Sequence, residues 1–243
     1  SEFLNIPDKY VVALSTGHAA LHLGLLSADI GVGDEVITSA FNNIADFQAI
    51  KATGASIVFC DIDDKTLTID PKKAEEMITE KTKAIIAMDY QVSLCDHDKI
   101  NELAKKYNLR VIHDAAHSFG SKYKGKMIGS FSDICMFSFD PVKTITCLDG
   151  GALIVNSKEQ ANKIRSMRLM GMDQSLKVMY QNKRASKYDV KNLGFRYHMS
   201  NMHGAIGCAQ IAKMDKIAKS RLESCMHYSN GLKNIDGIKI PDT

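Results

Sequence analysis

The stretch that decides the fold spans residues 83–113 and has the sequence KAIIAMDYQVSLCDHDKINELAKKYNLRVIH. It begins with an apolar run at 83–88, continues with a helical pattern at 96–107 and ends with a second apolar run at 110–113. This order of strand, helix and strand is typical of an α/β protein. Within both runs the residues at 84–88 and 111–112 are apolar instead of alternating with polar residues, so we expect a mostly parallel sheet with helices on both faces.

The same alternation continues on both sides of this stretch. We expect further strands at 11–14, 35–38, 56–59, 133–139 and 152–155, and further helices at 17–28, 43–52, 72–79, 158–171 and 200–232. Open α/β sheets bind their ligands at the carboxyl ends of the parallel strands. The residues that follow the predicted strands are therefore the ones to search for chemistry.

The composition excludes several classes of protein. The chain has 243 residues with 31 Lys and Arg against 28 Asp and Glu, a net charge of +3, which does not indicate a nucleic-acid partner. No apolar run approaches the ~18 residues of a membrane span, and the first residues show no signal-peptide pattern. The six cysteines lie in apolar segments without a C-x-x-C pair, so we expect small buried side chains in a cytoplasmic protein.

One segment, residues 172–192, is polar and basic and has the composition of a loop. It contains five cations against two acids, namely Lys177, Lys183, Arg184, Lys187 and Lys191 against Asp173 and Asp189. Such a charge run is a solvated surface in one interpretation and a contact for an anionic ligand, such as a sugar diphosphate, in the other.

Three segments at the ends of predicted strands carry the chemistry. Gly17 and His18 follow a strand and open a helix, where backbone N–H groups and the helix dipole favour a phosphate, although glycine is common at such turns. Asp114 ends an apolar strand, where a carboxylate needs a cationic partner unless it caps a helix. Lys143 follows a strand and a proline; a partly desolvated lysine there can form a Schiff base, and an ordinary surface lysine is the alternative.

Other chemistries find less support. The run from His113 to His117 has the spacing of the zinc motif H-E-x-x-H, but that motif needs a helix and His113 falls in a predicted strand, so we expect no metal site. The sequence has no nucleophile elbow, no P-loop and no complete dinucleotide fingerprint. A lysine, a carboxylate and a phosphate-binding turn together fit pyridoxal 5′-phosphate (PLP), which needs all three.

The chain resembles the DegT/DnrJ/EryC1/StrS family of PLP-dependent sugar aminotransferases. The resemblance rests on blocks that occur in the family's order along nearly the whole chain: Ser15–Leu21, Gly33–Ile37, Phe59–Asp63, Asp114–His117, Gly129–Phe131, Phe137–Lys143, Asp149–Gly151 and Gly194–Ser200. It implies the PLP fold-type-I large domain at 1–199, a long connecting helix at 200–233, and at 234–243 the start of a small C-terminal domain that is largely absent from this chain.

The resemblance implies a role for each matching residue. Lys143 forms the Schiff base with the cofactor and then moves a proton between cofactor and substrate. Asp114 pairs with the ring nitrogen, which keeps the ring an electron sink, and His117 hydrogen-bonds the phenolic oxygen of the ring. The family's dehydratase members have His at the Schiff-base position, so Lys143 is unlike that branch.

The remaining site residues include departures from the family's usual pattern. Gly17, His18 and Ser138 fall at the phosphate cradle, with His18 where the family often has Thr. Asn43 stands where an aromatic residue usually stacks on the ring. Arg196 replaces a common Asn at a position that reaches the phosphate of the neighbouring subunit in similar proteins, which implies a homodimer with a shared active site.

The resemblance implies an aminotransferase that moves an amino group, with glutamate as donor, to a keto carbon of a nucleotide-linked sugar, as in cell-surface polysaccharide biosynthesis. Two alternatives stay open. The first is another PLP enzyme, such as a lyase, a dehydratase or an amino-acid aminotransferase. The second is a non-catalytic PLP-binding regulatory protein.

Overall fold

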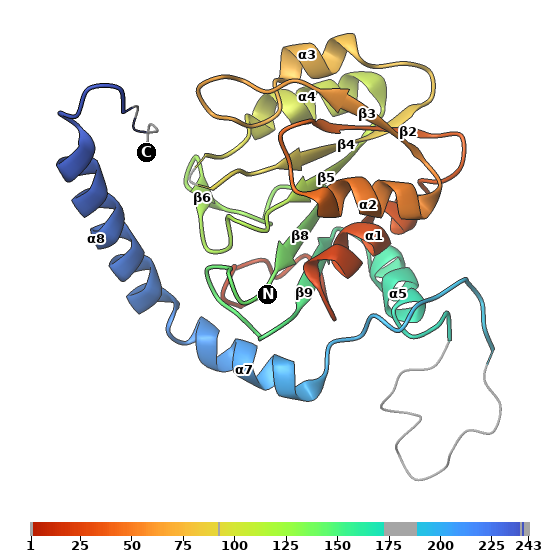
Figure 1. Ribbon diagram of the computed structural model, residues 1–243. Coiled ribbons are helices and arrows are strands. Elements are labelled where there is room, and N and C mark those ends of the chain that lie inside the picture. The colour runs from red at the N-terminus through yellow and green to blue at the C-terminus, as the bar shows by residue number, and fades with distance from the viewer. Residues whose placement is uncertain (1, 92, 173–188, 239, 241–243) are drawn as a thin grey trace.

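The fold is built on a seven-stranded sheet with helices on both faces (Figure 1). The computed structural model describes residues 2–91, 93–172, 189–238 and 240. In spatial order the strands are β1, β9, β8, β5, β4, β2 and β3. Their bounds are β1 Tyr10–Leu14, β2 Glu35–Ser39, β3 Ser56–Cys60, β4 Thr82–Met88, β5 Arg110–Asp114, β8 Ile134–Ser138 and β9 Gly151–Val155.

The sheet is mostly parallel, as the sequence predicted. Strands β3, β2, β4, β5 and β8 pair in parallel, and β9 runs antiparallel to both of its neighbours, β8 and β1. A separate two-stranded hairpin, which the sequence analysis missed, is formed by β6 (Lys122–Tyr123) and β7 (Lys126–Met127). Each of its strands has only two residues, too few for a period-2 pattern to be recognised.

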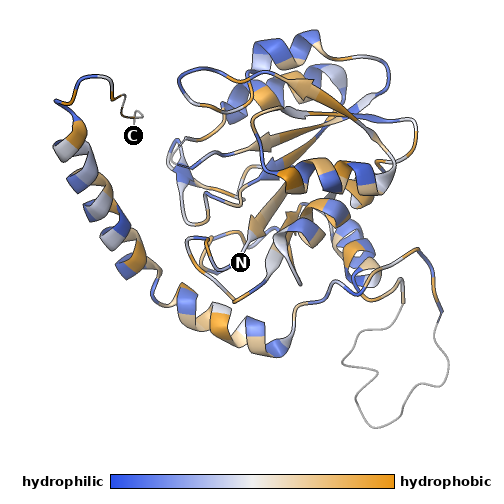
Figure 2. Cartoon of the chain, viewed as in Figure 1, coloured by the Kyte–Doolittle hydropathy of each residue, from blue (hydrophilic) through white to orange (hydrophobic). Residues whose placement is uncertain are grey.

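The described helices are α1 Gly17–Ser27, α2 Ile44–Thr53, α3 Pro71–Glu76, α4 His97–Tyr107, α5 Lys158–Met167, α7 Asn201–Ile211 and α8 Met214–Leu232. Helices α1, α2 and α5 cover one face of the sheet, and α3 and α4 cover the other. Neighbouring residues of one strand point to opposite faces: Ile112 packs with the α1 side and Val111 with the α4 side. The apolar residues of the central strands are therefore buried on both faces. Figure 2 shows that the strands are largely hydrophobic.

Polar side chains fix where the helices begin. Six helices have an N-terminal cap whose side-chain oxygen accepts a backbone N–H of the first turn: Thr16, Asn43, Asp70, Asp96, Ser157 and Ser200. The predicted helix 158–171 is shorter in the structure, because Met170 and Gly171 have φ angles of +60° and +74° and cannot continue it. Two of the caps, Thr16 and Asn43, line the cavity described below.

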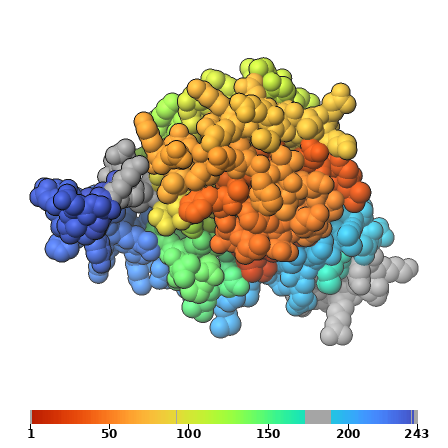
Figure 3. All heavy atoms as spheres, turned by 45° about the horizontal axis from the view of Figure 1, so that its top comes forward, coloured from red at the N-terminus to blue at the C-terminus, as the bar shows by residue number. Residues whose placement is uncertain are grey.

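The predicted helix 200–232 is two helices, α7 and α8, with a break at 212–213. At the break the chain changes direction, and Met214 packs into the core under the loop at Gly120. The rest of α8 is largely exposed, and the helix lies apart from the sheet and its flanking helices (Figures 1 and 3). The division into a large domain, a connecting segment and a small domain stays a prediction.

Two further features bear on the expectations from composition. Among the residues described, no helix combines the length and apolar character needed to cross a membrane. All six cysteines are free. Cys60, Cys95, Cys135 and Cys147 are buried as expected, whereas Cys208 is exposed and Cys225 is half-buried, so the expectation of burial was wrong for these two.

Candidate active site

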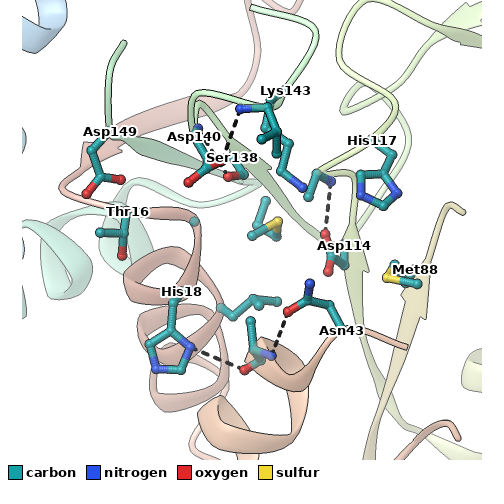
Figure 4. Close-up of a pocket in the computed structure, with 16 residues that line it drawn as sticks. Thr16, His18, Asn43, Met88, Asp114, His117, Ser138, Asp140, Lys143 and Asp149 are labelled. Carbon is teal, nitrogen blue, oxygen red and sulfur yellow. Dashed lines mark hydrogen bonds between the residues drawn. The ribbon is translucent and has the colours of Figure 1, made fainter. Parts of the chain in front are cut away.

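A cavity of about 390 Å³ lies where the carboxyl ends of β4, β5 and β8 meet the first turns of α1 and α2. It contains seven of the eight residues that the sequence analysis selected. Its lining consists of Thr16, Gly17, His18, Leu21, Asn43, Ala45, Met88, Asp114, Ala116, His117, Met136, Ser138, Asp140, Val142, Lys143 and Asp149 (Figure 4). The ends of parallel strands thus bring together residues that are far apart in the sequence.

One wall of the cavity is the start of α1 against the end of β8. The Thr16 hydroxyl accepts the Ala19 N–H at 2.9 Å and so begins the helix. A Cβ at Gly17 would lie 2.7 Å from Cβ of Ser138, closer than side chains approach one another. Glycine is therefore required here so that the free N–H groups of the helix start and the Ser138 hydroxyl can share one wall. Such an arrangement suits an anion like a phosphate.

The opposite wall carries Asp114, the last residue of β5. Its carboxyl is buried, and one oxygen accepts the Ala116 N–H at 2.9 Å. Burial raises the pKa of Asp114, while the Ala116 N–H and the charge of Lys143 act in the opposite direction. The alternative interpretation of Asp114 as a helix N-cap was wrong, because a turn and not a helix follows it. The carboxyl faces the cavity.

Lys143 lies on the turn that follows β8. Its backbone N–H donates to the Asp140 carbonyl at 3.0 Å, and the Asp140 carboxylate accepts the Val142 N–H at 3.1 Å. These two bonds shape the turn around Pro141 so that the half-buried Lys143 side chain extends into the cavity toward Asp114 and His117 (Figure 4). The interpretation of Lys143 as an ordinary surface lysine does not fit this position.

The protonation of His117 follows from its contacts. Its Nδ1 accepts the Gln91 N–H at 3.2 Å, so a neutral ring carries its proton on Nε2. Burial, and after it the charge of Lys143, lowers the pKa of His117. The side chain is therefore a neutral hydrogen-bond donor beside Lys143, which suits a phenolic oxygen as acceptor.

Two other predicted residues line the cavity with side chains that are already engaged. Nδ1 of His18 lies 3.2 Å from the Ala45 carbonyl oxygen, which can only accept, so this bond ties α1 to α2. The Asn43 side chain caps α2 by accepting the Ala45 N–H at 2.9 Å. The stacking role expected for Asn43 stays a prediction.

Arg196 is exposed and does not line the cavity. Its expected role at the site of a neighbouring subunit remains a prediction. In the basic segment, Lys177, Lys183, Arg184 and Lys187 lie outside the described residues, so its two interpretations stay open.

A buried polar network supports the site from behind. His113 belongs to β5, not to a helix, as the argument against the zinc motif assumed. It lies beside Asp89 and His97, and the three side chains place one potential metal-ligand atom each within 4.8 Å of one another. The Asp89 carboxylate already accepts from Nε2 of His113 at 2.7 Å, Nε2 of His97 at 2.9 Å and the Ser118 hydroxyl at 2.6 Å. The group is thus a hydrogen-bonded network that holds the segment carrying Asp114 and His117.

This network carries its own charge. Burial acts to lower the pKa of His113, but the Asp89 carboxylate prevails and raises it to about 10. Burial, set against the bond from Asp89, lowers the pKa of His97. The buried carboxylate is therefore paired with one charged imidazole and one neutral imidazole.

Several residues of the site were not selected from the sequence. Met88 and Met136 form an apolar part of the lining, and Asp140 and Asp149 add carboxylates at its rim. Asp46, the third residue of α2, is fully buried behind Asp114. Nothing in the sequence clearly indicated this burial, because an acid within a helical segment ordinarily lies on the surface.

The fold and the cavity define a class: α/β proteins in which a lysine, a carboxylate and a helix start surround one ligand at the carboxyl ends of a parallel sheet. The whole chain, residues 1–243, matches the model of the DegT/DnrJ/EryC1/StrS aminotransferase family. The chain belongs to this family.

Individual relatives agree with this assignment. The chain is 40% identical over 230 residues to GDP-perosamine synthase of Escherichia coli O157:H7, covering 95% of the chain and 60% of that protein. It is 37% identical over 233 residues to the spore coat polysaccharide biosynthesis protein SpsC of Bacillus subtilis (strain 168), covering 96% and 60%. The chain thus spans about 60% of the length of these curated relatives.

A solved structure extends the likeness to three dimensions. NtdA from Bacillus subtilis, with bound cofactor PMP (pyridoxamine 5′-phosphate), superposes with a TM-score of 0.83 at 32% identity, covering 96% of this chain and 52% of that one. The expected fold class, the large domain of PLP fold-type-I enzymes, is confirmed by this likeness.

Proposed function

We propose that this chain is the cofactor-binding part of a PLP-dependent aminotransferase that moves an amino group from glutamate to a keto carbon of a nucleotide-linked sugar. The observation that carries the proposal is the meeting of Lys143, Asp114 and the α1 start around one cavity. Family membership supports the aminotransferase class. The relative named GDP-perosamine synthase supports a nucleotide-linked sugar as substrate.

The residues present fit the cofactor. The glycine-opened start of α1, with Gly17, His18 and Ser138, would hold its phosphate. Asp114 would hold the ring nitrogen in its protonated form, and His117 would donate to the phenolic oxygen. Lys143 would attach to the aldehyde carbon as a Schiff base. When bound, PLP supplies an electron sink that the side chains of a protein lack.

Each of these side chains then has a defined task. Lys143 would take a proton from the donor's α-carbon and later return a proton to the carbon that receives the amino group. The negative charge of Asp114 would favour the protonated form of the ring nitrogen. The neutral His117 keeps its Nε2 proton as a fixed donor while Gln91 holds its Nδ1. Met88 and Met136 restrict water on the apolar side of the cavity.

We also propose that the working unit is a homodimer in which Arg196 of one subunit reaches the phosphate site of the other. Its exposed position outside its own cavity agrees with such a role. The six free cysteines support the reducing cytoplasm as the compartment.

Absorbance tests the proposal at low cost. Protein mixed with PLP should turn yellow, and borohydride should bleach the colour and leave a phosphopyridoxyl adduct that mass spectrometry finds on Lys143. Glutamate should then shift the unreduced complex to the spectrum of the pyridoxamine form. A bound cofactor that never responds to an amino donor would favour the regulatory protein, and loss of carbon dioxide or water from the substrate would favour another PLP enzyme.

A further inference from the structure

A second carboxyl lies behind the one that lines the cavity. Asp46 is on the first turn of α2, and its side chain is completely buried. Its Oδ2 accepts the amide of Asn42 at 2.6 Å, and Asn42 also donates to the Thr38 hydroxyl. Its Oδ1 is buried and receives no donor. A buried carboxylate oxygen without a donor is costly, so the ionised form of Asp46 is poorly supported.

The group next to the Asp46 side chain is the carboxyl of Asp114. Ile112 of β5 packs on the face that α1 and α2 cover, and Asp114, two residues later, points to the same face. The two side chains are close enough for a hydrogen bond, and the charge of Asp114 acts directly on Asp46. Two adjacent buried carboxyls cannot both be ionised, so they share one proton near neutral pH.

The surroundings decide which of the two carboxyls is neutral. The Asp114 carboxylate accepts the Ala116 N–H, and the charge of Lys143 favours its ionised form. Asp46 has only the neutral Asn42 amide, and burial together with the charge of Asp114 raises its pKa well above the usual range. Two further titratable groups lie near Asp114: Asp89, whose backbone N–H donates to the Asp114 carbonyl at 3.0 Å and whose carboxylate is paired with His113 and His97, and Cys95, a buried thiol whose pKa is raised by burial.

We propose that Asp46 is a neutral carboxylic acid that donates its proton in a hydrogen bond to the Asp114 carboxylate. Asp46 would then be a positioning residue: it orients the Asp114 carboxylate toward the cavity and leaves the pair with a single negative charge. Its role toward the ring nitrogen rests on the proposed function, whereas the shared proton itself is a property of the protein alone.

The first test uses the protein without cofactor. We would measure the unfolding equilibrium constant by urea denaturation between pH 4 and 9 for the wild type and for Asp46→Asn, which keeps a neutral donor of the same shape. The folded wild type retains a proton that the unfolded chain loses above pH ~4, so its unfolding constant should rise about tenfold per pH unit relative to that of Asp46→Asn. This rise should continue to the pKa of the folded pair. The control Asp64→Asn, at an exposed aspartate, should show no such divergence.

A ratio of unfolding constants that is flat or falls with pH would overturn the proposal, because Asp46 would then be ionised in the folded protein. Should Asp46→Asn fail to fold, the wild type labelled with 13C at the aspartate carboxyls gives the answer. One carboxyl resonance should remain protonated above pH 6, and it should titrate at lower pH in Asp114→Asn. If every aspartate is ionised at pH 6, the proposal is wrong.

The second test addresses the cofactor. Asp46→Asn should keep the PLP dissociation constant within about threefold of that of the wild type and leave the pH dependence of the bound cofactor's visible absorbance unchanged. Asp46→Ala, which lacks a donor, should weaken binding at least tenfold and shift that pH dependence. Equal behaviour of the two variants would refute the positioning role. If the wild type itself bound no PLP, the proposed function would fail while the apoprotein titration would still decide the shared proton.

Discussion

Replacing Gly17 with alanine tests the contact on which the phosphate wall depends. The new Cβ would lie 2.7 Å from Cβ of Ser138, 2.8 Å from its Oγ and 3.3 Å from Cε of Met136. The Met136 methyl and the Ser138 hydroxyl can rotate away, but Cβ of Ser138 is fixed to the backbone of β8. The start of α1 must therefore move from the sheet by about 0.7 Å to restore an ordinary contact.

The expected magnitude follows from two opposing effects. Overpacking of a rigid site costs about 1–3 kcal/mol, and the better helix propensity of alanine recovers up to about 1 kcal/mol. We expect a net loss of about 1–2 kcal/mol in the free energy of unfolding. Because the same movement displaces the N–H groups at the cavity, PLP affinity should fall at least tenfold, which corresponds to about 1.4 kcal/mol.

The control is Gly24→Ala in the same helix, where a Cβ meets its nearest neighbour, Cδ2 of Leu153, at an ordinary 3.4 Å. Urea denaturation of the apoprotein and titration with PLP, followed by absorbance, measure both quantities. The double variant Gly17→Ala with Ser138→Gly should show a favourable coupling energy in stability, because it removes the clashing atom. If Gly17→Ala is no less stable than Gly24→Ala and binds PLP equally well, the reasoning from close approach is refuted.

Three further predictions follow from the site. Lys143→Ala should lower the rate of amino transfer at least about 100-fold, and no phosphopyridoxyl adduct should be found after borohydride reduction. An adduct formed in unchanged yield would contradict the assignment. The stability that His113 contributes by holding its proton beside Asp89 is fully present below pH ~6.5 and should be lost as the pH rises toward about 10. Over this pH range the free energy of unfolding should therefore fall less steeply in His113→Gln than in the wild type. An identical slope in the two proteins would count against the charged imidazole. A mixed dimer of one Arg196→Ala subunit and one Lys143→Ala subunit should have one intact site of two if Arg196 acts across the subunit interface, so mixing the two variants should restore activity. Activity that stays at the level of the separate variants would argue against a shared site.

The sequence allowed the strands and the helix starts to be predicted because their signals are local, whereas most of the site residues were proposed from the family resemblance. A strand buried on both faces must be apolar throughout, and a helix start favours a residue such as Thr16 or Ser200 as its cap, so both are visible in a short window. The boundaries that were wrong depended on distant contacts. Nothing between 200 and 232 marks the break before Met214, since the break serves packing against Gly120.

What the sequence by itself determined is most of the strands and helices and the choice of Lys143, Asp114 and Gly17 as candidate site residues. Only the tertiary structure decided that these residues surround one cavity, that Gly17 is needed because Ser138 approaches it, and that Asp46 lies against Asp114. The physical reason is that backbone preference acts over a few residues, whereas burial, close approach and the sharing of a proton depend on what the folded chain brings together from elsewhere.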